Sequence, residues 1–170
     1  MFSLIMSFLL LGQPVDSPLK LVPQVDVNRY AGKWYEIASM PIKWQKNCDC
    51  TTAEYKLQSD GKIAVYNSCY DRKKKKRVDT EGKASAVDGT GNAHLKVEFF
   101  HLFKGDYQII ELDENYQYAM VGTADRKYLW ILSRAPIMDE PTAKRLIAQA
   151  ARQGFVTARL NFTKQSCYNK

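Results

Sequence analysis

From about residue 50 onward, the sequence consists of short segments rich in β-branched and aromatic residues, separated by turn-forming residues. Ser59-Asp60-Gly61 contains an Asp-Gly pair of the kind that closes tight hairpins, and Asp88-Gly89-Thr90-Gly91-Asn92 is a second strong turn signal. The pattern predicts strands at residues 34–39, 51–57, 62–70, 78–87, 94–103, 107–112, 116–123 and 128–133. Short links join these eight segments in order, which predicts an antiparallel meander.

An eight-stranded meander must protect its two edges, and closing into an up-and-down barrel removes them. At eight strands the interior of such a barrel is just wide enough to be filled by side chains or to hold one small ligand. The predicted fold class is therefore all-β, an eight-stranded antiparallel up-and-down barrel.

After the strands, the spacing of apolar residues changes to that of a helix. Asp139 is a suitable N-cap, Pro141 fits the first turn and Gly154 stands at the C-cap position. The apolar stripe between them is formed by Ala143, Leu146, Ile147, Ala150 and Ala151. We expect one α-helix of roughly three turns, packed with this stripe on the outside of the barrel. Residues 157–162 predict a last short strand.

The length and the N-terminal segment indicate one exported domain. The chain has 170 residues, 45% of them hydrophobic and 25% charged, as in an ordinary single globular domain. Residues 1–11 are mostly large and apolar with no charged side chain, which is typical of the apolar region of a secretion signal. A basic stretch is missing and Gly12-Gln13-Pro14 is a poor cleavage site, so a misplaced start codon or a buried N-terminal strand stays open.

We therefore expect a signal or disordered segment over residues 1–17 and one domain over residues 18–170. Residues 9–17 contain no cysteine that could carry an N-terminal lipid anchor. The expected location is the periplasm, the outer-membrane face or the extracellular space, without a lipid-anchored cysteine.

The net charge of +7 is local. Residues Arg72 to Arg77 are six consecutive basic side chains, and removing their six charges from the net +7 leaves +1. This basic run lacks the interleaved aromatic residues of a single-strand nucleic-acid platform, so no nucleic-acid partner is expected. A solvated loop and a contact with an anionic membrane surface are both open, the latter worth about 1 kcal/mol per basic residue.

Four cysteines, Cys48, Cys50, Cys69 and Cys167, are an even number, which predicts two disulfides in an oxidising compartment. A zinc site is disfavoured because Cys48 and Cys50 are separated by a single residue, whereas zinc ligand pairs usually have two or more between them. We expect neither a metal nor a cofactor.

Four sequence motifs, in order, resemble those of the lipocalin family. They are Gly32-Lys33-Trp34 in the first strand, Asn67 at the end of the third, Val121-Gly122-Thr123 with Asp125 in the seventh, and residues 128–134 in the eighth. The resemblance covers about residues 25–165 and is greatest to bacterial outer-membrane lipocalins and apolipoprotein D. It implies a barrel that binds a fatty acid, a lysophospholipid or another small apolar molecule.

The resemblance also implies structural roles. Gly32, Trp34 and Arg134 correspond to the family signature, in which the Trp side chain closes one end of the barrel and the Arg lies over its ring. A disulfide from Cys50 to Cys167 would match the tail-bonded cysteine of apolipoprotein D, which leaves Cys48 with Cys69 across the first hairpin. A bond from Cys69 to Cys167 is the competing connectivity.

The ligand-binding residues come from resemblance and from strand alternation, in which every second side chain faces inward. Tyr55, Asn67 and Trp130 match positions that line the cavity of apolipoprotein D-like proteins. Alternation adds Ala53, Leu57 and Val65, and parity alone adds Phe99, Tyr107, Ile109, Tyr118 and Met120. An error of one residue in register would turn any of these outward.

The sequence thus predicts a protein that transports or stores a fatty acid or lysophospholipid in membrane lipid maintenance, and not an enzyme. A lipocalin-type isomerase is the alternative, but it would need a free, activated thiol. The sequence contains no Gly-x-Ser-x-Gly elbow, and no catalytic residue is assigned. A membrane-docking module that uses the basic run is the other alternative.

Overall fold

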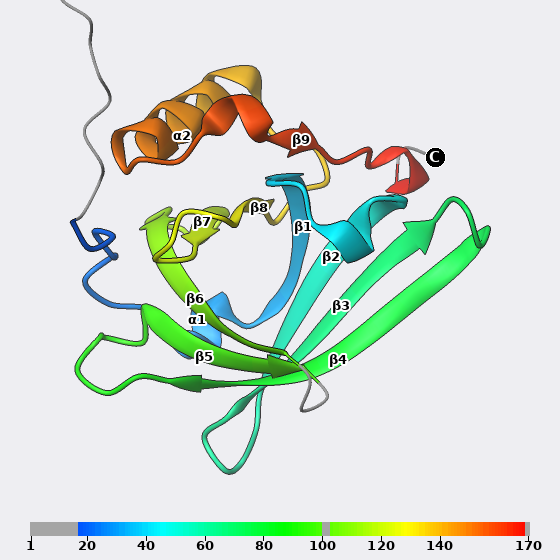
Figure 1. Cartoon of the computed structure of the whole chain (residues 1–170). Helices are drawn as coiled ribbons and strands as arrows, with labels where there is room; N and C mark the ends of the chain where they lie inside the picture. The colour runs from blue at the N-terminus through cyan, green and yellow to red at the C-terminus, as the bar shows by residue number, and fades with distance from the viewer. Residues whose placement is uncertain (1–16, 100–102, 169–170) are drawn as a thin grey trace, which may run out of the picture.

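The computed structural model of the protein describes residues 17–99 and 103–168. Within these ranges, antiparallel strands form one sheet in the order β2-β3-β4-β5-β6-β7-β8-β1-β9. Strand β1 also pairs with β2, so the first eight strands close into a barrel (Figure 1). The predicted eight-stranded meander and barrel are confirmed.

The bounds of the elements agree closely with the predicted segments. The barrel strands are β1 (Gly32–Ser39), β2 (Cys48–Leu57), β3 (Ile63–Asp71), β4 (Lys76–Ala86), β5 (His94–Phe99), β6 (Phe103–Leu112), β7 (Tyr118–Gly122) and β8 (Leu129–Ser133). The other elements are α1 (Val27–Tyr30), α2 (Glu140–Arg152), β9 (Asn161–Phe162) and the 3-10 turns η1 (Lys43–Gln45), η2 (Thr157–Arg159) and η3 (Ser166–Tyr168).

Three boundaries differ from the prediction. Strand β6 begins at Phe103, so residues 104–106, predicted as the link before the sixth strand, belong to β6 and pair with β5. Residues 157–162 are mostly the turn η2, and only Asn161 and Phe162 pair as β9 with the end of β1. The basic run is not entirely a loop, because Lys76 and Arg77 begin β4, where they pair with Asp71 and Tyr70. The predicted signal segment lies almost wholly outside the described residues, as does part of the strand predicted at 94–103.

The connections between strands alternate between the two ends of the barrel, because neighbouring strands are antiparallel. The links β1–β2, β3–β4 and β7–β8 lie at one end, which we call the open end. The links β2–β3, β4–β5 and β6–β7 lie at the other, the closed end, which α1 covers. The backbone N–H of Arg72 donates to the Asn47 carbonyl (3.0 Å), which joins two loops of the open end.

The apolar side chains divide into two clusters. The inner cluster lies inside the barrel around Trp34 and includes Tyr30, Tyr55, Val65 and Ile109. The outer cluster lies between the barrel wall and α2, and includes Met120, Ile131, Leu146 and Phe155. Figure 1 shows α2 lying across the side of the barrel formed by β7, β8 and β1.

Helix α2 forms where the sequence predicts it. The Asp139 side chain accepts a hydrogen bond from the Thr142 N–H (2.9 Å), and Pro141 lies in the first turn. Gly154 follows the helix with a φ of +89°, the left-handed conformation that glycine adopts at a helix end. Leu146 and Ala150 are the buried residues of the helix, so the centre of its apolar stripe does face the barrel. Ala151 is exposed, so its assignment to the stripe is wrong.

Candidate ligand-binding site

The barrel interior brings together most of the residues predicted to bind a ligand. Tyr55 and Val65 belong to the buried inner cluster, and four more predicted residues pack against it: Ala53, Phe99, Tyr107 and Trp130. Asn67 is paired with Ala53 on β2, so it lies on the same inward face. These side chains come from β2, β3, β5, β6 and β8, and those other than Asn67 all pack in or against the inner cluster. Their contact with a ligand stays a prediction.

Three predicted residues do not pack with the inner cluster. Met120 is fully buried in the outer cluster, below α2, so its assignment to the interior is wrong. Its neighbours Ala119 and Val121 face inward instead, and Tyr118 packs with the outer cluster, which is the one-residue parity error that alternation permits. Leu57 stands opposite Ile63 on the inward face, but it lies at the last position of β2 and is 40% exposed.

Trp34 and Arg134 close one end of the barrel. The guanidinium carbon of Arg134 lies 3.8 Å from the centroid of the Trp34 ring, and Trp34 itself is fully buried. Arg134 also donates hydrogen bonds to the carbonyls of Arg29, Ala31 and Lys33 at 2.8–2.9 Å. The first two of these carbonyls stand at the end of α1, where a helix leaves its carbonyls without partners.

Gly32 allows this closure. Its φ of +90° is open to glycine but strained for other residues, and a side chain there would begin 3.4 Å from Nη1 of Arg134. The three residues of the family signature therefore form one structural unit, as the resemblance implies.

A cluster of three tyrosines lies just inside the closed end. The hydroxyl of Tyr107 stands 2.7 Å from that of Tyr30 and 2.8 Å from that of Tyr55. The Tyr30 ring also packs on Trp34, with centroids 4.9 Å apart. Burial raises the pKa of Tyr55 to about 12 and raises those of Tyr30 and Tyr107 well above the ordinary tyrosine value. The cluster is thus an uncharged hydrogen-bonding group in an apolar surrounding.

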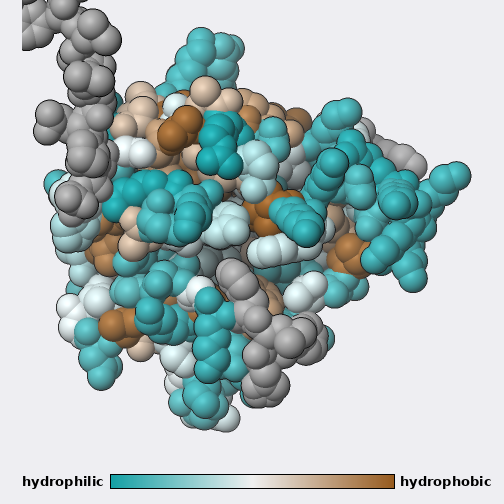
Figure 2. Space-filling model, viewed as in Figure 1, coloured by the Kyte–Doolittle hydropathy of each residue, from teal (hydrophilic) through white to brown (hydrophobic). Residues whose placement is uncertain are grey.

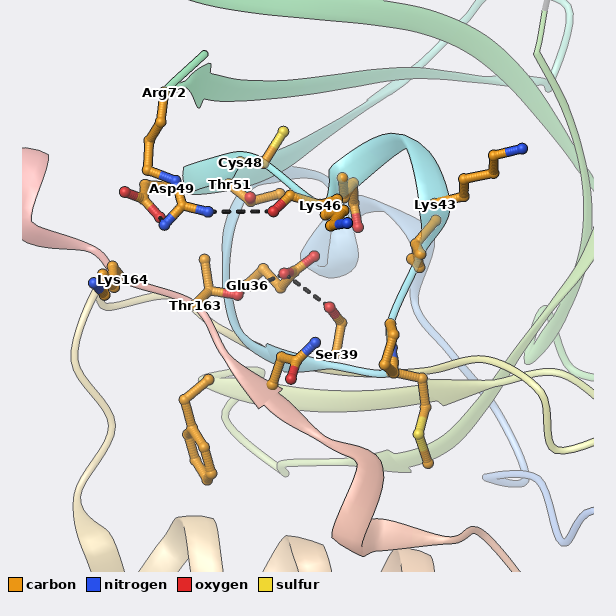
Figure 3. Close-up of a pocket in the computed structure, with 16 residues that line it drawn as sticks. Glu36, Ser39, Lys43, Lys46, Cys48, Asp49, Thr51, Arg72, Thr163 and Lys164 are labelled. Carbon is orange, nitrogen blue, oxygen red and sulfur yellow. Dashed lines mark hydrogen bonds and ion pairs between the residues drawn. The ribbon is translucent and has the colours of Figure 1, made fainter.

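A pocket of about 590 Å³ opens where β1 and β2 separate toward the open end. The segment after β9 runs through this gap, where Thr163 N–H donates to the Ile37 carbonyl and Cys50 N–H to the Lys164 carbonyl. Figure 3 shows Ser39 and Thr163 on either side of Glu36 in this pocket, which we call the seam pocket.

Glu36 is buried without an ion pair among the described residues. Its Oε1 accepts hydrogen bonds from the hydroxyls of Thr163 (2.5 Å) and Ser39 (3.0 Å). Burial raises the pKa of this carboxyl, and the two hydrogen bonds offset part of the rise. Sequence reasoning missed this group, because a Glu in a strand has the appearance of a solvent-facing residue and Thr163 lies far along the chain.

The open end is rich in basic and exposed side chains. Most of the basic run forms the β3–β4 connection, and all six of its residues are exposed. Trp44 of η1 is 65% exposed in the neighbouring loop, flanked by Lys43. Figure 2 shows hydrophilic side chains projecting at the tip of the β3–β4 hairpin, on the right of the view.

The two disulfides join Cys48 to Cys69 and Cys50 to Cys167. This is the connectivity that the resemblance implies, and it removes the competing bond from Cys69 to Cys167. The second bond fixes the C-terminal tail to β2 beside the seam pocket. All four cysteines are therefore bonded.

Two further observations concern other kinds of site. Among residues 17–99 and 103–168, no group of three or more His, Cys, Asp or Glu side chains is arranged to hold a metal ion. Within the same residues, no helix is long and apolar enough to cross a membrane.

Comparison with known proteins identifies the family. Residues 25–165 match the family model of the lipocalin-like domain. The chain is 39% identical over 156 residues to the outer membrane lipoprotein Blc of Vibrio cholerae, covering 91% of this chain and 90% of that protein. It is 33% identical over 133 residues to bovine apolipoprotein D, covering 71% of this chain and 67% of that protein.

Solved structures agree at the level of the fold. Apocrustacyanin C2 superposes with a TM-score of 0.69 at 20% identity, covering 82% of this chain and 79% of its own. Insecticyanin from the tobacco hornworm Manduca sexta superposes with a TM-score of 0.67 at 20% identity, covering 87% and 85%. The closed eight-stranded barrel, its Gly32-x-Trp34 signature with Arg134, and these matches show that the chain belongs to the lipocalin family.

Proposed function

We propose that the protein binds one fatty acid or lysophospholipid inside the barrel and transports or stores it in membrane lipid maintenance. The observation that carries the proposal is that inward-facing side chains on several strands, among them Ala53, Phe99, Tyr107 and Trp130, are only partly buried. Since they point into the barrel, the surface that they retain borders space that their own packing does not fill.

The chemistry of the interior suits an acyl chain. Aliphatic and aromatic side chains line it, and each methylene removed from water contributes about 0.8 kcal/mol to binding. The closed end supplies a boundary through Trp34, and the basic open end suits a carboxylate or phosphate head group. Membership of the lipocalin family, with apolipoprotein D among the relatives, supports a small apolar ligand.

An exported location supports this function. The relatives named outer membrane lipoproteins favour the periplasm or the outer-membrane face, and two disulfides are typical of oxidising compartments. Fractionation of cells that express the native chain, with an antibody against it, tests this. Recovery in the cytoplasm with reduced cysteines would contradict it.

Binding is tested by titrating the delipidated protein with palmitic acid and with a lysophospholipid, followed by Trp fluorescence and native mass spectrometry. We expect one equivalent to bind. Val65→Trp places a large ring in the interior and should abolish binding, whereas Tyr66→Trp on the outward face of the same strand should bind normally. No uptake of either lipid by the folded wild-type protein would overturn the proposal.

A second candidate function is docking to an anionic membrane, and the specific observation is that the basic run and Trp44 lie at the same end of the barrel as the expected ligand entrance. Such a contact would let the ligand enter directly from the membrane. Each lysine near an anionic surface is worth about 1 kcal/mol, so three together would change binding roughly 100-fold or more.

Vesicles of phosphatidylcholine with and without phosphatidylglycerol test this docking in a sedimentation assay. Replacing Lys73, Lys74 and Lys75 by Asn should release the protein from anionic vesicles, and Asn tolerates the positive φ of Lys75. Replacing Lys56 and Lys62, which are exposed at the closed end, by Asn should leave binding to anionic vesicles unchanged. If both variants bind anionic vesicles equally well, the basic run does not dock the protein to a membrane.

The structure favours no thiol-based enzyme. An isomerase that uses a cysteine needs a free thiolate, and both disulfides would have to be reduced to supply one. We therefore propose a binding function rather than catalysis.

A further inference from the structure

The tyrosine cluster at the closed end has a hydrogen atom for which it has no acceptor. Tyr30, Tyr55 and Tyr107 each carry one O–H proton, and the cluster contains two hydroxyl contacts, both to Tyr107. Each contact uses one proton. The third proton has no acceptor among the described residues, whichever hydroxyl carries it.

This cluster lies where a bound molecule would end. Tyr30 packs on Trp34, which closes the barrel, and Tyr107 is the member of the cluster that retains accessible surface. Tyr107 is paired with Leu95, and both face the interior. A hydroxyl with a spare proton beside this apolar space favours an oxygen atom next to it, because a donor left without a partner on ligand binding is unfavourable.

We infer that the closed end recognises an uncharged oxygen on the end of the ligand that enters first, to which the tyrosine cluster donates a hydrogen bond. The inference rests on the proposed function and deepens it. The ligand class that it names is an acyl chain with a hydroxyl or carbonyl at the terminus distant from its carboxylate.

The charge distribution requires that this oxygen be neutral. The basic run stands at the opposite end of the barrel, and the guanidinium of Arg134 already donates to the carbonyls of Arg29, Ala31 and Lys33. Burial also holds the tyrosines in their neutral form. A carboxylate at the closed end would therefore lose its hydration without meeting a cation, whereas the same carboxylate at the open end stays near water and lysines.

The experiment compares three ligands of equal chain length on the delipidated full chain: palmitic acid, 16-hydroxypalmitic acid and hexadecanedioic acid. We expect the 16-hydroxy acid to bind about 3- to 10-fold more tightly than palmitic acid, the value of one net hydrogen bond. The dicarboxylic acid should bind more weakly than the 16-hydroxy acid. A series of ω-hydroxy acids with 12 to 18 carbons should show one optimal length, set by the depth of the barrel.

Variants test the proton count. In the triple variant Tyr30→Phe, Tyr55→Phe and Tyr107→Phe, the shapes are kept and every hydroxyl is removed, so the preference for the 16-hydroxy acid should disappear while palmitic acid still binds. The single variant Tyr107→Phe should lose the preference as well, because Tyr107 is the member of the cluster whose hydroxyl a ligand can reach. Tyr66→Phe, which removes an exposed hydroxyl outside the barrel, is the matched control.

The outcomes separate the two proposals. If palmitic acid binds and no ω-hydroxy acid of any length binds more tightly, the inference fails and the carrier function stands. If the single variant Tyr107→Phe keeps the full preference, the tyrosine cluster is not the donor and the inference fails, and this can be measured even if the triple variant does not fold. If neither lipid binds the wild-type protein, both proposals fail together.

Discussion

Replacing Arg134 should destabilise the closed end of the barrel more than its partial exposure suggests. One guanidinium stacks on Trp34 at 3.8 Å and donates to the carbonyls of Arg29, Ala31 and Lys33. The ring contact is worth about 0.5–2 kcal/mol and a hydrogen bond from a charged donor about 1.5–3 kcal/mol. Water can replace part of the carbonyl contacts, so we expect Arg134→Ala to lower the free energy of unfolding by about 3–4 kcal/mol.

Urea denaturation, followed by circular dichroism with the disulfides intact, measures this loss. At about 2 kcal/mol per molar urea, it corresponds to a midpoint lowered by roughly 1.5–2 M. Arg134→Lys should lose more than half as much, because an ammonium keeps the charge but not the planar set of donors. The matched control is Arg145→Ala on α2, an arginine with an ion pair to Glu111 (3.1 Å) on the surface, for which we expect less than about 1 kcal/mol.

Two results would refute this reasoning. If Arg134→Ala costs no more than Arg145→Ala, the contacts at the closed end do not contribute the stability assigned to them. If Arg134→Lys is as stable as the wild-type protein, charge alone is sufficient and the hydrogen bonds to three carbonyls are unimportant.

Three further predictions concern other parts of the barrel. Since burial raises the folded-state pKa of Glu36 above its unfolded value, the contribution of Glu36 to stability falls as pH rises from the unfolded pKa through the folded one. Glu36→Gln lacks this titration, so the free energy of unfolding of the wild type minus that of Glu36→Gln, measured by urea titration, should fall across this range, and a constant difference would contradict the assignment. Gly122→Ala should cost about 1–3 kcal/mol in the same assay, because the new methyl would begin 2.5 Å from the Phe155 ring; an unchanged midpoint would show that the ring moves freely. Replacing Cys50 and Cys167 by Ser opens a loop with a sequence separation of 117 and should lower the free energy of unfolding by about 4–5 kcal/mol in the chain-entropy model. Calorimetry should show this loss as a lower Tm. A loss under about 1 kcal/mol would mean that other contacts hold the tail.

The fold could be predicted because its determinants are local. Asp60-Gly61 turns the chain between β2 and β3, and Asp139 caps α2 through its own side chain, so each signal is complete within a few residues. The closure of the barrel is not local, but an eight-stranded meander has few other ways to protect its edges. The tail disulfide from Cys50 to Cys167 came from family resemblance, since four cysteines alone allow three connectivities.

The facing of individual side chains was less predictable where both faces of a strand are apolar. On β7 the inner face meets the barrel interior and the outer face meets α2, so Met120 and Val121 are both fully buried and the sequence does not distinguish them. Register shifts add to this uncertainty. The pairing of β6 with β7 shifts between Ile109 and Glu111, so parity counted from one end of β6 is wrong at the other.

The polar groups of the interior were the least predictable, because contacts between distant parts of the chain create them. Tyr30, Tyr55 and Tyr107 come from α1, β2 and β6, and nothing in the sequence near any of them indicates that their hydroxyls meet. Glu36 depends in the same way on Thr163. Apolar residues alone would give a barrel that binds any chain of suitable length, since burial of methylenes does not depend on direction. Discrimination among such ligands must therefore come from these few buried polar groups, and that is where experiments on specificity should begin.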